Sequence, residues 1–239
     1  MQVSDCGWHS CYTRGVLLYY ITDRMQLGAD ERGREEGLLK RITEAAAAGV
    51  DYIQLRERDL TGRELERLAG QAVRRVRDAG SRTKLLVNSR IDVAMGVGAD
   101  GVHLRSDDIP ASEVRAIWAK GVGRTDCVIA QSCHSLQEVL LAESHGADFV
   151  VFGPVFGKQG SSQPATGVER ISEVVGRGGP ADLKVEAGQT LRMPVIALGG
   201  VTVENAADCA RAGAAGVAAI RMFQQGDVSE TVRRLRHSE

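Results

Sequence analysis

The segments AGVDYIQL (48–55) and HGADFVVF (145–152) share one pattern, and that pattern decides the fold. In each, a glycine ends a helix-like segment, small or acidic residues follow, and a short run of β-forming residues comes next. Glycine is the usual residue where a chain leaves a helix with a positive φ. The pattern therefore predicts a helix that leads directly into a buried strand.

The same pattern recurs along the chain, and amphipathic segments of helical period separate the strand-like runs. Strands that are apolar on both faces and separated by helices must lie parallel. Eight such units predict an α/β fold, a single closed (β/α)₈ TIM barrel over residues 16–239, preceded by a flexible tail, 1–15. An open doubly wound sheet is the alternative, but no G-x-G-x-x-G follows the first strand. The other predicted strands lie in 16–23, 84–90, 97–104, 127–134, 194–200 and 212–220.

The composition favours a small-molecule partner. The chain has 239 residues, 43% of them apolar, and a net charge of −1, so it lacks the overall field that holds proteins on nucleic acid or anionic membranes. Its five cysteines are odd in number and scattered, which is typical of reduced thiols. Without a long apolar run, we expect a cytoplasmic protein that uses no membrane. The sequence leaves its oligomeric state open.

Polar residues gather where the predicted strands end, which is where a (β/α)₈ barrel builds its active site. Gln54, Arg56 and Arg58 alternate, so they share one side of their strand and are placed to meet an anion. The alternative is that both arginines simply extend into solvent. Other polar residues that end predicted strands are Asn88, Ser89, His103, Arg105, Asp107, Asp108, Gln131, Ser132 and His134.

Gly199 and Gly200 end a buried strand, and Thr202 is placed to cap a helix whose first turn holds Glu204 and Asn205. Free amides at a helix N-terminus bind phosphate, although tight packing alone also selects glycine. The neighbouring predicted strand ends at Ile220 and Arg221. The loop 153–167 has the composition of a lid, in which Lys158 is either an anion ligand or a solvated lysine. We assign no function to the glycine-rich segment 176–193.

The sequence resembles the thiamine phosphate synthases and their thiazole tautomerase (TenI) relatives over about residues 16–225. The motifs that carry the resemblance occur in family order, namely IQLRERD (53–59), LLVNSRIDVAMGVGADGVHLRSDDIP (85–110), SCHSLQEV (132–139), GADFVVFGPVF (146–156) and PVIALGGVTVEN (194–205). The resemblance implies an enzyme that joins a hydroxymethylpyrimidine diphosphate to a thiazole phosphate and releases diphosphate, with Mg²⁺ on the leaving group.

Site residues follow from the resemblance position by position. It implies that Asp108 and Ser89 lie at the Mg²⁺ site, and that Arg56, Arg58 and Ser132 belong to the catalytic set. His134, which ends a predicted strand, is added to that set as an acid–base candidate. It also implies a substrate-binding set of Gln54, Arg56, Arg58, Asn88, Ser132, Gly200 and Ile220, to which the positions at the strand ends add Lys158, Gly199 and Arg221.

Several positions depart from the family pattern. Ser89 stands where the family has a second aspartate, Arg58 replaces a lysine, and Arg105 and Arg221 replace a glycine and a serine. Two alternatives therefore stay open. One is a thiazole tautomerase that uses His134 as its acid and base, and the other is a phosphate-binding relative that has lost catalysis.

Overall fold

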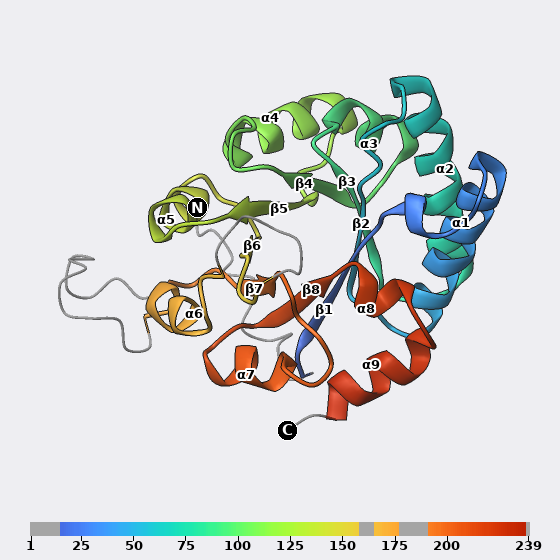
Figure 1. Ribbon diagram of the computed structural model, residues 1–239. Helices are drawn as coiled ribbons and strands as arrows, with labels where there is room; N and C mark the ends of the chain where they lie inside the picture. Colours follow the sequence, from blue (N-terminus) through green and yellow to red (C-terminus); the bar gives the residue numbers. More distant parts are fainter. Residues whose placement is uncertain (1–14, 158–164, 177–190, 238–239) are drawn as a thin grey trace.

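The strands form a closed barrel in a computed structural model that describes residues 15–157, 165–176 and 191–237. They run parallel in chain order from β1 to β8, and β8 pairs with β1 (Figure 1). The predicted (β/α)₈ barrel is confirmed, and the open sheet is excluded by this closure. The strands are β1 (Leu17–Ile21), β2 (Tyr52–Leu55), β3 (Lys84–Asn88), β4 (Gly101–Leu104), β5 (Val128–Cys133), β6 (Phe149–Phe152), β7 (Val195–Leu198) and β8 (Gly216–Ala219).

Helices surround this barrel on the outside (Figure 1). A short 3₁₀ helix, η2 (Arg24–Gln26), follows β1, and two helices follow β8. The α-helices are α1 (Glu31–Ala47), α2 (Gly62–Asp78), α3 (Ile91–Val97), α4 (Ala111–Val122), α5 (Leu136–Ser144), α6 (Glu169–Val174), α7 (Ala206–Arg211), α8 (Arg221–Gln224) and α9 (Val228–His237).

The glycines of the repeated pattern do what the sequence predicts. Gly49, Gly98, Gly146 and Gly213 each follow a helix, and each has a positive φ, from +66° to +102°. A side chain would be strained in this left-handed conformation, which lets the chain turn from each helix into the following strand.

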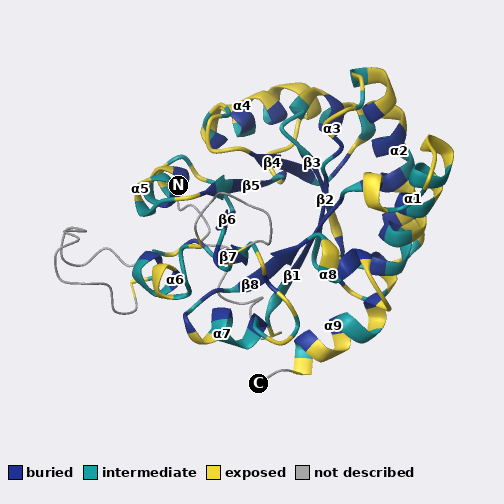
Figure 2. Ribbon diagram, in the orientation of Figure 1, coloured by how far each residue is buried: buried dark blue, intermediate teal, exposed yellow. Residues whose placement is uncertain are grey.

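Two apolar layers hold the fold together. One lies between the sheet and the helices, so the strands are buried while the outer faces of the helices are exposed (Figure 2). The other fills the barrel interior, because alternate residues of each strand point inward. The buried residues of this inner layer are Tyr19, Ile21, Leu86, Ala130, Phe149, Val151, Ile196 and Ala218.

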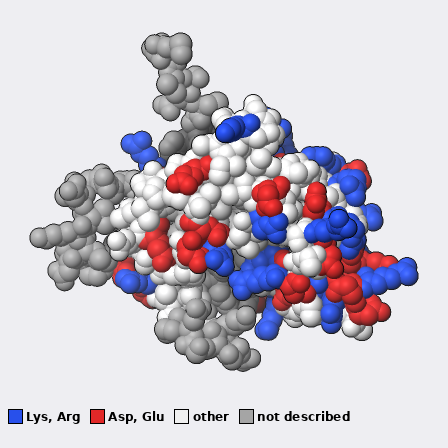
Figure 3. Space-filling view, turned by 90° about the horizontal axis from the view of Figure 1, so that it is seen from above, with Lys and Arg blue, Asp and Glu red and all other residues white. Residues whose placement is uncertain are grey.

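Acidic and basic side chains are interspersed on the face shown in Figure 3, in keeping with the net charge of −1. Within the described part of the chain, no helix is long and apolar enough to cross a membrane. Three sequence predictions fall outside the described residues: the tail up to residue 14, Lys158, and positions 177–190 of the glycine-rich segment.

Candidate active site

A hydrogen-bonded polar chain crosses the ends of β2, β3 and β4. Gln54 Nε2 donates to Asn88 Oδ1 over 2.8 Å, and Asn88 Nδ2 donates to Ser89 Oγ over 3.3 Å. Ser89 Oγ donates in turn to Asp108 Oδ2 over 2.7 Å, so these four predicted site residues form one connected group. Gln54 is buried, and the other three are half-buried at the open end of the barrel.

Arg56 lies beside this group as a half-buried cation. Its guanidinium makes no hydrogen bond or ion pair with any residue that the structure describes. Burial lowers the pKa of Arg56, and the nearby charge of Arg58 lowers it further, which means that the two guanidinium groups repel each other. Such a pair is stabilised by a bound anion. Arg58 itself is exposed.

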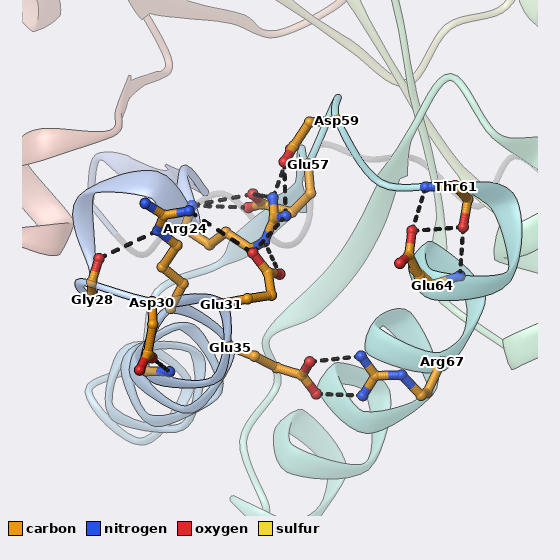
Figure 4. Close-up of polar contacts among 12 residues, drawn as sticks. Arg24, Gly28, Asp30, Glu31, Glu35, Glu57, Asp59, Thr61, Glu64 and Arg67 are labelled. Atoms are coloured by element: carbon orange, nitrogen blue, oxygen red, sulfur yellow. Dashed lines mark hydrogen bonds and ion pairs between the residues drawn. The ribbon is translucent and has the colours of Figure 1, made fainter.

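A cluster of ion pairs around the buried Arg24 holds the loop after β2 (Figure 4). The Arg24 guanidinium lies 3.3 Å from Glu57 Oε2 and 2.6 Å from Asp59 Oδ1, and it also pairs with Glu31. Thr22 Oγ1 donates to Glu57 Oε1 over 2.6 Å. Glu57 points away from the barrel axis while its neighbour Arg56 points inward, so the cluster anchors the outer side of the strand end.

Two histidines take different positions at the ends of β4 and β5. His103 is buried inside the barrel, with Nδ1 2.7 Å from the Tyr19 hydroxyl and Nε2 2.8 Å from Ser132 Oγ. Burial, aided by the charge of Arg56, lowers the pKa of His103 to about 3. His134 is exposed, and its Nδ1 lies 2.6 Å from the carbonyl oxygen of Gly153, a contact that joins it to the loop after β6.

A cavity of about 550 Å³ lies beyond the ends of β7 and β8. Gly199 and Gly200 line it, and their φ angles are +100° and +63°. A Cβ on Gly199 would lie 2.7 Å from Pro154 Cα, and one on Gly200 would lie 2.8 Å from Phe156 Cβ. Tight packing and positive φ thus both require glycine, and the packing alternative is part of the explanation. Ile220 and the exposed Arg221 line the same cavity, together with the acidic Asp23 and Glu204.

Three residues that line this cavity have backbone N–H groups without a partner among the described residues. The N–H groups of Gly200, Val201 and Met222 donate no hydrogen bond to any residue in the described ranges, and all three residues line the cavity. Grouped free amides are the donors that phosphate binds in proteins. β7 and β8 sit next to β1 and β2 around the closed barrel, so this cavity and the Arg56 region occupy neighbouring parts of one rim.

The helix after Gly200 starts later than the sequence predicted. α7 begins at Ala206, whereas Glu204 and Asn205 belong to a preceding turn. The Asn205 side chain holds this turn, because Oδ1 accepts from the Thr202 N–H over 2.8 Å and Nδ2 donates to the Gly200 carbonyl oxygen over 3.1 Å. The Asn205 N–H donates to Thr202 Oγ1, so Thr202 caps the turn rather than the helix.

The predicted Mg²⁺ ligands offer a sparse donor set. No cluster of three histidine, cysteine or acidic side chains suited to a metal is present among the described residues. Asp108 Oδ2 already accepts from Ser89 Oγ and from the Arg105 N–H, and Asp107 pairs with the Arg105 guanidinium. Mg²⁺ keeps several waters and often binds through one or two carboxylates plus substrate phosphates. Of the two predicted ligands, Asp108 alone carries a carboxylate, and its other oxygen lies 3.7 Å from Arg105 Nε, so an ion here would need substrate phosphates as further ligands.

Sequence reasoning did not assign roles to several residues that shape this rim. Arg24 and Glu57 were missed because a charged pair distant in sequence resembles ordinary surface charge. Tyr19 was missed because an aromatic residue in a strand is typical of a core. A detectable signal was Glu57 itself. It follows β2 and continues the alternation of the outward-facing Ile53 and Leu55, so burial there would require a charged partner.

Comparisons with known proteins agree with this architecture. A family model described as thiamine monophosphate synthase matches residues 18–223. A thiamine-phosphate synthase from Methanoculleus marisnigri is 37% identical over 226 residues, covering 93% of this chain and 94% of the relative. One from Roseiflexus sp. is 33% identical over 226 residues, covering 94% of this chain and 85% of the relative.

Comparison with solved structures also finds similarity to this family. The thiamine phosphate pyrophosphorylase from Pyrococcus furiosus superposes with a TM-score of 0.71 at 28% identity, covering 92% of this chain and 94% of that one. A 3-hexulose-6-phosphate synthase, at 16% identity and a TM-score of 0.58, covering 93% of this chain and 97% of that one, shares the fold alone. With a family model that spans most of the barrel and relatives that match along nearly their whole length, this chain belongs to the thiamine monophosphate synthase family.

Proposed function

We propose that this protein is a thiamine-phosphate synthase, a transferase that condenses a hydroxymethylpyrimidine diphosphate with a thiazole phosphate and releases diphosphate. The observation that carries the proposal is the pairing, on one barrel rim, of an amide-lined cavity with an unpaired, half-buried arginine. The reaction has two phosphorylated substrates, and the rim offers two separate places for anions. The names of the relatives support the same activity.

In this proposal, the free amides of Gly200, Val201 and Met222 hold the phosphate of the thiazole substrate. Ile220 supplies an apolar wall for the thiazole, and the exposed Arg221 adds a positive charge at the mouth of the cavity. The Asn205 side chain donates to the Gly200 carbonyl oxygen, so this acceptor next to the free amides is already engaged. Phosphate binding thereby positions the thiazole nitrogen for attack.

The pyrimidine diphosphate is assigned to the polar chain on β2, β3 and β4. Negative charge develops on the leaving oxygen as the carbon–oxygen bond breaks, and Arg56 and Arg58 stabilise that charge. Gln54 and Asn88 orient the substrate, and Asp108 with Ser89 would hold Mg²⁺, which supplies further stabilisation of the departing diphosphate. A carbon–nitrogen bond to the thiazole then completes the transfer. In this proposal both substrates are small phosphorylated molecules, and the enzyme acts on them in the cytoplasm.

The proposal is tested by incubating purified protein with both substrates and Mg²⁺ and measuring thiamine phosphate and diphosphate together. Stoichiometric formation of the two products is the expected result. Conversion of a thiazole carboxylate phosphate alone would instead identify a tautomerase, with His134 as the candidate acid and base. Binding of thiazole phosphate without either reaction would identify a non-catalytic relative.

Replacing Arg56 tests where catalytic charge acts. Arg56→Ala should lower kcat about a hundred- to a thousandfold, the usual cost of losing one donor to a developing negative charge, while the KM for thiazole phosphate stays nearly unchanged. Arg63→Ala is the matched control, because Arg63 is an exposed arginine on α2. Equal kcat values for Arg56→Ala and the wild type would contradict the assigned role.

A further inference from the structure

Three side chains from β1, β4 and β5 form a hydrogen-bonded chain inside the barrel. The Tyr19 hydroxyl lies 2.7 Å from His103 Nδ1, and His103 Nε2 lies 2.8 Å from Ser132 Oγ. Tyr19 is fully buried and His103 is 2% exposed, whereas Ser132 is half-buried at the open end. The chain therefore runs from the buried interior to the rim.

The proton positions follow from the need of a buried phenol to donate. Within the described residues, His103 is the hydrogen-bond partner of the Tyr19 hydroxyl. If Nδ1 carried a proton, Tyr19 would have to accept it, and its own O–H would be left without an acceptor in the barrel interior. That outcome is costly, so Tyr19 donates to Nδ1. The same argument excludes the imidazolium form, which would donate from both nitrogens.

A neutral imidazole that accepts at Nδ1 carries its proton on Nε2. Nε2–H then donates to Ser132 Oγ, so the serine oxygen is engaged and its own proton is free. No other hydrogen bond of Ser132 Oγ to a described residue is present. The charge of Arg56 also acts on the buried His103 and lowers its pKa, which disfavours the imidazolium form.

We propose that Tyr19 and His103 are positioning residues that fix Ser132 as a hydrogen-bond donor to an anionic phosphate oxygen. Tyr19 sets the tautomer of His103, and His103 sets the direction of the Ser132 hydroxyl. A ligand group that itself donates is disfavoured at this point, because it would face the serine proton. Only the identity of the anion, diphosphate, rests on the proposed function; the hydrogen-bonded chain does not depend on it.

The tautomer is tested without substrate. Nitrogen NMR of protein labelled with ¹⁵N-histidine at neutral pH should show His103 protonated on Nε2 alone, with its signals assigned through His103→Gln. Tyr19→Phe keeps the ring and removes the donor, so it should shift His103 toward the Nδ1–H form. Tyr20→Phe is the matched control, since Tyr20 is equally buried on the same strand but donates to Gln224 outside the barrel. An Nδ1–H or doubly protonated His103 in the wild type would overturn the proposal.

The consequence for Ser132 is tested with inorganic diphosphate and Mg²⁺ in a calorimetric titration. Ser132→Ala and Tyr19→Phe should each weaken binding about ten- to a hundredfold, as expected for one hydrogen bond to a charged group, whereas Tyr20→Phe should not. Equal binding by wild type and Ser132→Ala, including no binding by either, would overturn the assignment of the anion. A failed synthase assay with an intact Nε2–H tautomer would refute the proposed function but not the hydrogen-bonded chain.

Discussion

Gly200 offers a direct test of why the phosphate cavity requires glycine, because the effects of its backbone conformation and of its packing can be separated by experiment. Its φ is +63°, and a Cβ there would lie 2.8 Å from Phe156 Cβ and 2.9 Å from the Phe156 carbonyl oxygen. Gly80 has the same φ of +63°, but a Cβ there would meet no atom within 4 Å. Gly80 follows α2 and precedes β3, at the opposite end of the barrel from the candidate site.

The two alanine variants should differ by the energy of overpacking. A left-handed residue with a Cβ costs about 1–2 kcal/mol, so Gly80→Ala should lower the free energy of unfolding by about that amount. Overpacking adds about 1–3 kcal/mol, so Gly200→Ala should lose about 2–5 kcal/mol in total. The smaller entropy of the unfolded alanine chain affects both variants equally and cancels in the difference.

Urea unfolding of both variants measures this difference, and thermal unfolding should show about 2–4 °C for each kcal/mol in a chain of this size. Gly200→Ala should also raise the KM for thiazole phosphate, because the 199–201 backbone must shift away from Phe156 and move its free amides. Gly80→Ala should leave that KM unchanged. Equal losses of stability in the two variants would refute the reasoning that Gly200 is selected by its neighbours.

Three further predictions concern the ion-pair cluster, the metal and the thiols. Arg24→Ala leaves Glu57 buried with its cation removed, so the free energy of unfolding should fall by about 3–5 kcal/mol. Arg32→Ala breaks an exposed pair with Glu36 and should be nearly neutral. Similar losses for the two variants would contradict a buried Arg24–Glu57 pair. Ser89→Asp adds a carboxylate beside Asp108, and aspartate tolerates the left-handed backbone conformation of this position. The Mg²⁺ concentration that gives half-maximal rate should therefore fall. An unchanged or higher concentration would argue against a metal at this site. Burial raises the pKa of Cys133 to about 12 and that of Cys209 to about 11. Iodoacetamide at neutral pH should therefore label neither thiol in the native protein and both in urea, as mapped by mass spectrometry, and rapid native labelling of either thiol would contradict its burial.

Some of the candidate site could be predicted because it follows the strands directly. Gln54, Asn88 and Asp108 end predicted strands, and a parallel barrel brings all such ends to one rim, so their hydrogen-bonded group needed only the correct fold. The start of α7 was placed too early because the sequence does not show that the Asn205 side chain bonds back to Gly200. The roles of Lys158 and of the 176–193 segment stay predictions.

By itself, the sequence determined the barrel. Its helix–glycine–strand pattern is local, and local signals repeated around a chain define both the elements and their parallel direction. Only the tertiary structure decided which inward side chains meet. Tyr19 and His103 are 84 positions apart and His103 and Ser132 are 29 apart, yet they form one hydrogen-bonded chain. The alternation of side chains along a strand shows whether a residue points into or out of the barrel. The relative shift of the strands in the closed barrel determines which inward side chain it meets.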